Sequence, residues 1–126
     1  MGKNILVIDD DKLVRMTLKR LLSKESYRVS IAESGQEALS LLETNPFDLI
    51  ISDLKMPGMN GIETVKRIRE YLEQNNKSPV PEIFISAYAK EDIYQEALKL
   101  NAKDYLEKPF DIAALLQSIK KAIESK

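Results

Sequence analysis

The sequence contains no cysteine and no histidine among its 126 residues. Without cysteine the chain has no disulfide, no thiolate metal site and no thiol nucleophile, a composition that fits a reducing compartment. Without histidine it lacks the commonest general base and an imidazole that could carry its own phosphoryl group. Any phosphohistidine donor must therefore be another molecule.

A charge imbalance and a long apolar run are also absent. Nineteen Lys and Arg residues stand against twenty Asp and Glu residues, so the chain as a whole attracts neither nucleic acid nor an anionic membrane surface. The apolar stretch before Asp9 is too short for a signal peptide or a membrane span. We expect a cytoplasmic protein with no membrane insertion and no direct contact with nucleic acid.

The remaining composition suits one folded domain. Hydrophobic residues make up 44% and charged residues 31% of the chain, which is enough to bury a core beneath a solvated surface. Chains of this length usually form one domain, and no repeat, low-complexity tract or linker is visible. We interpret residues 1–126 as a single domain.

Hydrophobic periodicity predicts five strands that alternate with five helices. Ile5–Ile8 is apolar throughout, as in a strand covered on both faces, and Tyr27–Ala32 alternates, as in a strand nearer a sheet edge. The other strands are expected at Asp48–Ser52, Ile83–Ala87 and Asp104–Glu107. Helices are expected from Lys12 to about Leu22, Ser34 to Thr44, Ile62 to Glu73, Glu91 to Leu100 and Ile112 to Ile123.

Strict alternation of strands and helices favours an α/β fold with one parallel, doubly wound sheet, because right-handed crossovers place the helices on both faces. In such a sheet, ligands bind beyond the carboxyl ends of the strands. Polar side chains stand at this end of four predicted strands: Asp9, Asp10 and Asp11, then Asp53, then Ser86, then Lys108. The sequence therefore predicts a site at this edge.

Carboxylates that meet at one sheet edge repel one another unless a cation neutralises them. Oxygen ligands alone favour Mg²⁺, with Mn²⁺ as a substitute. The Ser86 hydroxyl and the Lys108 ammonium group are suited to contact the oxygens of an anion, which indicates a phosphoryl group. Asp53, alone at its strand end, is the best candidate for the nucleophile that accepts this group as an acyl phosphate.

Each residue also has a purely structural interpretation. Asp11 precedes a helix and could simply cap it, and Asp53 could cap a turn. Ser86 could satisfy local backbone groups, and Lys108 could be an ordinary surface residue. The prediction of a site therefore depends on their occurrence together at one edge.

Four segments in this order and spacing resemble the response-regulator receiver domain family: Ile5–Asp11, Ser52–Gly61, Ile85–Ala87 and Tyr105–Phe110. The resemblance spans essentially the whole chain. It implies a flavodoxin-like sheet in the order 2-1-3-4-5. It also implies a two-component or phosphorelay function, with a sensor histidine kinase or a histidine phosphotransfer protein as the phosphoryl donor.

The resemblance implies that Asp53 is phosphorylated and that the ligands of Mg²⁺ are Asp10, Asp53 and the main-chain carbonyl of Lys55. Asp9 is expected to act through a bound water. These assignments make the reaction Mg²⁺-dependent self-phosphorylation and autodephosphorylation within a signalling domain, not metabolic catalysis.

The resemblance also implies that Ser86 and Lys108 contact the phosphoryl group, and that the bond from Lys108 to Pro109 is cis. Tyr105 stands at the position of the family's switch aromatic, which turns inward as Ser86 moves, although ordinary packing on a strand would explain this tyrosine as well. The face of the fourth helix, fifth strand and fifth helix is then expected to control an effector protein, which the sequence does not identify.

Some positions vary from the family's pattern. Ser86 replaces the commoner threonine and keeps the hydroxyl. Lys55 and Tyr88 flank the expected route of the hydrolytic water and offer it no carboxylate or amide, so we expect slow self-dephosphorylation. The connection Gln74–Pro81 is longer than usual and could be either inert or a contact for a partner.

Two other functions compete with this interpretation. A Mg²⁺-dependent aspartyl-phosphate phosphatase needs a second Asp two residues after the nucleophile, where this chain has Lys55. A pseudo-receiver would make protein contacts without phosphorylation, and the complete set of site residues argues against it. We expect a monomer or a weak dimer, and either a stand-alone regulator or part of a larger protein, because the chain ends just after the last predicted helix.

Overall fold

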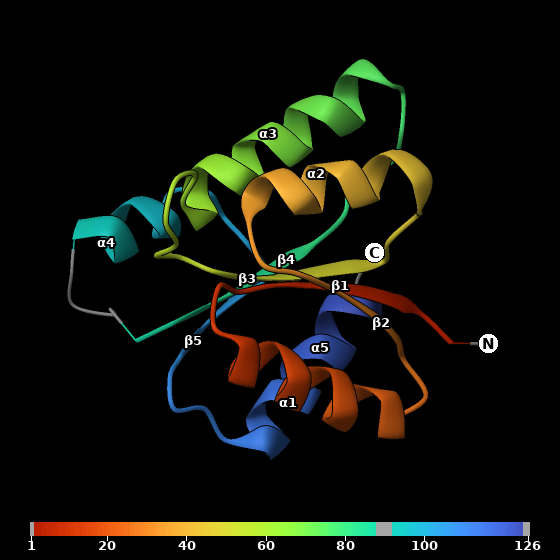
Figure 1. The fold of residues 1–126 in the computed structure, drawn as a ribbon, viewed down its shortest axis with the longest axis vertical. Helices are drawn as coiled ribbons and strands as arrows, with labels where there is room; N and C mark the ends of the chain where they lie inside the picture. The colour runs from red at the N-terminus through yellow and green to blue at the C-terminus, as the bar shows by residue number, and fades with distance from the viewer. Residues whose placement is uncertain (1, 88–91, 125–126) are drawn as a thin grey trace.

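A computed structural model of the chain describes residues 2–87 and 92–124 (Figure 1). The strands are β1 (Asn4–Ile8), β2 (Arg28–Ala32), β3 (Leu49–Asp53), β4 (Glu82–Ser86) and β5 (Asp104–Glu107). The helices are α1 (Lys12–Lys24), α2 (Gly35–Thr44), α3 (Gly61–Gln74), α4 (Asp92–Leu98) and α5 (Ile112–Glu124). Strands and helices alternate as predicted.

The strands form one parallel sheet in the order β2-β1-β3-β4-β5. Helices α1 and α5 lie on one face, and α2, α3 and α4 lie on the other (Figure 1). The predicted α/β fold with a doubly wound parallel sheet is confirmed. None of the helices in the described part of the chain is long and apolar enough to cross a membrane.

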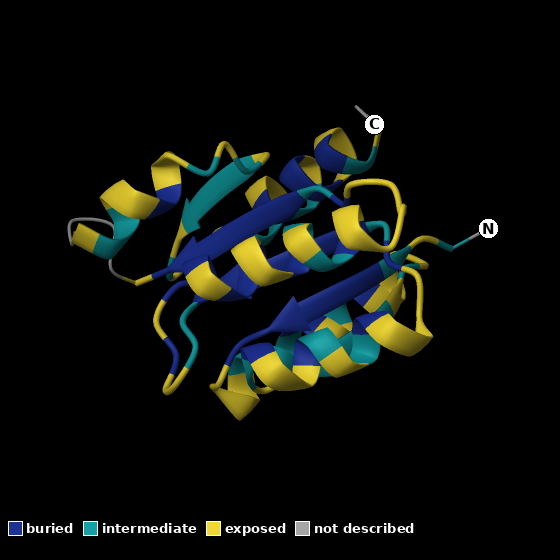
Figure 2. Cartoon of the chain, turned by 90° about the horizontal axis from the view of Figure 1, so that it is seen from above, coloured by how far each residue is buried: buried dark blue, intermediate teal, exposed yellow. Residues whose placement is uncertain are grey.

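The apolar run of β1 is buried on both faces because successive strand residues point in opposite directions. Ile5 and Val7 belong to the core beneath α1 and α5, whereas Leu6 and Ile8 belong to the core beneath α2 and α3. All four side chains are fully buried. Figure 2 shows the inner strands as buried and the outer faces of the helices as exposed.

Several element boundaries near the site differ from the prediction, and β4 ends at Ser86 rather than at Ala87. Strand β3 extends to Asp53, because this residue pairs in register with Ile85 of β4. Helix α3 begins at Gly61 because Asn60 caps it, its side chain accepting a hydrogen bond of 2.9 Å from the Glu63 amide. A Cβ at Gly61 would collide with the carbonyl oxygen of Asp53, so only glycine allows α3 to start this close to β3.

Helix α4 ends at Leu98 rather than at the predicted Leu100, and the predicted start at Glu91 lies outside the described residues. The Tyr105 hydroxyl accepts a hydrogen bond of 2.8 Å from the Ala102 amide and donates one of 3.0 Å to the Ala97 carbonyl. This side chain satisfies backbone groups that another helical turn would have used. The Tyr105 side chain of β5 therefore forms hydrogen bonds with the backbone at the point where α4 ends.

The long connection between α3 and β4 is packed against the rest of the domain. Val80, near its end, is 9% exposed and joins the core formed with α2 and α3. The connection also lines a surface cavity of about 760 Å³ together with Arg69 and Glu82.

An ion pair with a buried carboxylate joins α3 to the start of β4. The Arg69 guanidinium donates to both carboxylate oxygens of Glu82, at 2.9 and 2.7 Å, and to the Leu100 carbonyl at 2.8 Å. The Glu82 side chain is only 5% exposed, and that of Arg69 is 40% exposed. The pair connects α3, β4 and the turn after α4.

We predict that Arg69→Met lowers the free energy of unfolding by about 3 kcal/mol, because it leaves the Glu82 carboxylate buried without its cation. This value is at the low end for a buried pair, since Arg69 is partly exposed. The control is Arg67→Met, which removes an exposed pair with Glu63 on the same helix and is expected to cost about 0.5 kcal/mol. Urea denaturation measures both, and equal losses would contradict the prediction.

Candidate functional site

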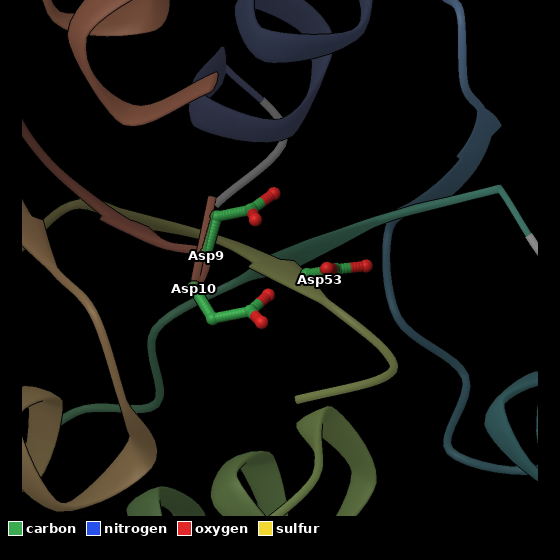
Figure 3. Close-up of side chains that lie close together, drawn as sticks. All are labelled: Asp9, Asp10 and Asp53. Atoms are coloured by element: carbon green, nitrogen blue, oxygen red, sulfur yellow. The ribbon is translucent and has the colours of Figure 1, made fainter. Parts of the chain in front are cut away.

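Three carboxylates meet at the carboxyl edge of the sheet. Asp9 and Asp10 follow β1, and Asp53 ends β3, the strand that pairs directly with β1. One oxygen from each side chain lies within 4.8 Å of the others, and all three carboxylates extend to the same side of the strand ends (Figure 3). Within residues 2–87 and 92–124 no other group of acidic residues has this geometry.

Asp9 is fully buried, and each of its polar atoms has a partner. Its amide donates to the Ala32 carbonyl at 3.1 Å, and its carbonyl accepts from Arg15 Nη1 at 2.8 Å. Oδ1 accepts from the Asp11 amide at 2.9 Å, and Oδ2 accepts from Lys108 Nζ at 2.8 Å. The partners lie in β2, at and just before the start of α1, and just after β5, and together they hold Asp9 in one position.

Asp53 is 5% exposed, and its two oxygens have different neighbours. Oδ1 accepts a hydrogen bond of 2.8 Å from the Leu54 amide, and Oδ2 lies 3.4 Å from Lys108 Nζ. Burial and then the charge of Asp9 raise the pKa of Asp53 to about 6, although Lys108 and the Leu54 amide favour the charged form. The two carboxylates that contact Lys108, together with that of Asp10, outnumber its one ammonium group.

Lys108 directly follows β5, and its ammonium group contacts the carboxylates of Asp9 and Asp53. Burial acts to lower the pKa of its ammonium group, but the hydrogen bond to Asp9 and the charges of Asp53 and Asp9 together raise it. The Lys108 amide donates to the Ser86 carbonyl at 2.8 Å, which brings the 2% exposed Ser86 to the same edge. The Lys108–Pro109 bond is cis, the isomer that the family resemblance implies.

Other candidates lie around this centre. Asp11 caps α1, since its Oδ1 accepts a hydrogen bond of 2.8 Å from the Leu13 amide, which agrees with its structural interpretation. Asp10 and Lys55 are exposed, and Tyr88 lies outside the described residues. The fold thus brings together Asp9, Asp10, Asp53 and Lys108.

Tyr105 lies away from the carboxylates, on the outer strand. Its ring stacks on Phe84, with centroids 5.8 Å apart, and meets Tyr94 edge-on at 6.3 Å. Its hydroxyl is bonded to the backbone of the turn after α4. The movement expected of Tyr105 stays a prediction.

Arg15 was not predicted as part of the site. It lies in the first turns of α1, where helical periodicity suggests only a polar surface position. Its side chain is nevertheless 11% exposed and contacts the Asp9 carbonyl. No local pattern indicates this contact, because it depends on how α1 packs beside the end of β1.

The chemistry of the three carboxylates fits a hard divalent cation. All candidate ligands are oxygens, and the site has a buried and an exposed side, which suits an ion that keeps some of its waters. Asp9, Asp10 and Asp53 are therefore a candidate site for Mg²⁺ or Mn²⁺.

Residues 5–120 match the model of the response regulator receiver domain family. Sporulation initiation phosphotransferase F of Bacillus subtilis (strain 168) is 34% identical over 126 residues, covering 100% of this chain and 98% of that protein. The transcriptional regulatory protein FixJ of Bradyrhizobium diazoefficiens is 36% identical over 120 residues, covering 95% of this chain but only 56% of that protein.

Solved structures agree with these matches. A CheY-like response regulator receiver domain protein from Methanospirillum hungatei JF-1 has a TM-score of 0.88 and 29% identity, covering 99% of this chain and 96% of that one. The chemotaxis protein CheY4 of Vibrio cholerae has a TM-score of 0.85 and 30% identity, covering 97% and 99%. The chain therefore belongs to the response regulator receiver domain family.

Proposed function

We propose that this chain is a phosphoacceptor receiver that takes a phosphoryl group onto Asp53 from the phosphohistidine of a sensor histidine kinase or a histidine phosphotransfer protein. The observation that carries this proposal is a buried Asp53 carboxylate beside both Lys108 and two further carboxylates. A carboxylate oxygen of Asp53 forms the new bond to phosphorus while the bond from phosphorus to the donor's imidazole nitrogen breaks. The imidazole leaves with the electron pair.

Lys108 and Ser86 would support this transfer from the phosphoryl side. The ammonium group lies 3.4 Å from Asp53 Oδ2 and keeps its charge through its bond to Asp9. It can therefore offset charge on the transferred group. The Ser86 hydroxyl is the second candidate to contact phosphoryl oxygens, because its residue is joined to Lys108 by a backbone hydrogen bond.

Asp10, Asp53 and the main-chain carbonyl of Lys55 would hold Mg²⁺ or Mn²⁺, with Asp9 acting through a water. When bound, this ion offsets the negative charge of the carboxylates and of the phosphoryl group. The excess of negative charge at the site supports this assignment.

The output would be a change in the face formed by α4, β5 and α5. Tyr105 joins the end of α4 and the turn after it through two hydrogen bonds, so an inward rotation of its ring would break both. An effector protein that distinguishes the two states of this face completes the pathway. We place this signalling in the cytoplasm, with the receiver as a monomer or a weak dimer.

Incubation with acetyl phosphate and Mg²⁺ is expected to add one phosphoryl group to the unaltered chain and none to Asp53→Asn. Intact-mass spectrometry measures the adduct. Asp111→Asn, a matched change at an exposed residue, should still be phosphorylated, and removal of Mg²⁺ with a chelator should prevent the adduct. A chain that gains no phosphoryl group from any donor would instead be a pseudo-receiver that acts only through protein contacts.

We predict that Lys108→Met slows phosphorylation by acetyl phosphate roughly 100-fold, because the substitution removes a preorganised positive charge beside the acceptor. The rate is measured by the mass of quenched samples at saturating Mg²⁺. Lys103→Met, on the exposed turn before β5, should leave the rate unchanged. An unaltered rate in Lys108→Met would show that this ammonium group has no part in the transfer.

The phosphorylated chain is expected to lose its phosphoryl group slowly, because neither Lys55 nor Tyr88 has a carboxylate or an amide to orient the attacking water. The half-life is measured by intact mass after the donor has been removed. Lys55→Asn introduces an amide at this position and is expected to shorten the half-life. A half-life of seconds in the unaltered chain is the result that contradicts this prediction.

A further inference from the structure

Arg15 is a nearly buried cation whose contacts converge on the backbone of the site. Its side chain is 11% exposed, Nη1 donates to the Asp9 carbonyl at 2.8 Å, and Nη2 lies 3.7 Å from Glu33 Oε2. Its own amide donates to the Asp11 carbonyl at 3.1 Å. Arg15 therefore spans the segment that carries the first two carboxylates and links it to the loop after β2.

The bonded carbonyl belongs to the peptide unit that joins Asp9 to Asp10. The other side of Asp9 is fixed independently, because its amide donates to the Ala32 carbonyl and its carboxylate contacts Lys108. Asp10, by contrast, is exposed. The hydrogen bond from Arg15 therefore restrains the peptide unit between the buried Asp9 and the exposed Asp10.

We infer that Arg15 is a positioning residue for the divalent cation, because it fixes the peptide unit between Asp9 and Asp10 so that both carboxylates face Asp53. This inference rests on the proposed Mg²⁺ site. Partners that orient metal ligands without touching the metal commonly change metal affinity by roughly 10-fold or more when they are removed.

The direction in which the Mg²⁺ affinity changes when Arg15 is removed distinguishes a positioning role from a purely electrostatic one. A positive charge near a cation site repels the cation, so if Arg15 acted only through its charge, its removal would strengthen Mg²⁺ binding. If Arg15 orients the ligands, its removal weakens binding despite the lost repulsion. A residue that merely stabilised the fold would lower the melting temperature and leave the affinity of the folded chain unchanged.

The test measures the Mg²⁺ dissociation constant of the full chain by isothermal titration calorimetry at fixed ionic strength, together with the melting temperature without Mg²⁺. We expect Arg15→Met to raise the dissociation constant roughly 10-fold. Arg15→Lys should give an intermediate value, because one ammonium group can reach the carbonyl but lacks the planar fork. Arg20→Met removes the same charge from an exposed position on α1 and should change neither quantity.

A dissociation constant that is unchanged or lowered in folded Arg15→Met overturns the inference and leaves the proposed function intact. If Arg15→Met does not fold, Arg15→Lys decides, and an unaltered dissociation constant in that variant overturns the inference. A failure of the unaltered chain to bind Mg²⁺ would contradict the proposed Mg²⁺-dependent function, and this inference with it.

Discussion

The mutual repulsion of buried carboxylates is the constraint on which the rest of this structure depends. Asp9 is fully buried and Asp53 is 5% exposed, so neither charge is well solvated by water. Lys108 contacts both, at 2.8 and 3.4 Å, but one ammonium group cannot balance these two acids together with Asp10. The remaining negative charge makes this edge of the sheet receptive to a cation.

The parallel sheet makes this crowding possible. Strands β1, β3, β4 and β5 are neighbours in register, so their carboxyl ends deliver side chains from distant parts of the sequence to one edge. Gly61 contributes by its lack of a side chain, because only glycine lets α3 begin against the Asp53 carbonyl. The site therefore results from strand register and from close backbone packing.

At the opposite edge of the sheet a buried carboxylate also meets a cation, but there the two form a structural ion pair. Glu82 is buried there too, but the Arg69 guanidinium contacts both of its oxygens. The one positive charge of Arg69 balances the one negative charge of Glu82. This pair connects α3, β4 and the turn after α4. Glu82 and the Asp9–Asp53 pair are both buried, so the excess of negative charge, more than burial, distinguishes the candidate site from this structural ion pair.

Local sequence determined the strands, the helices and their alternation in the described residues, because apolar periodicity follows directly from backbone geometry. Alternation implies a parallel sheet, and this made Asp53 and Lys108 predictable as neighbours. The contacts of Arg15 with Asp9 and of Arg69 with Glu82 were decided only by the tertiary structure. Each depends on how a helix packs on the sheet, and the local pattern of a helix does not specify which backbone or side-chain group its polar residues will meet.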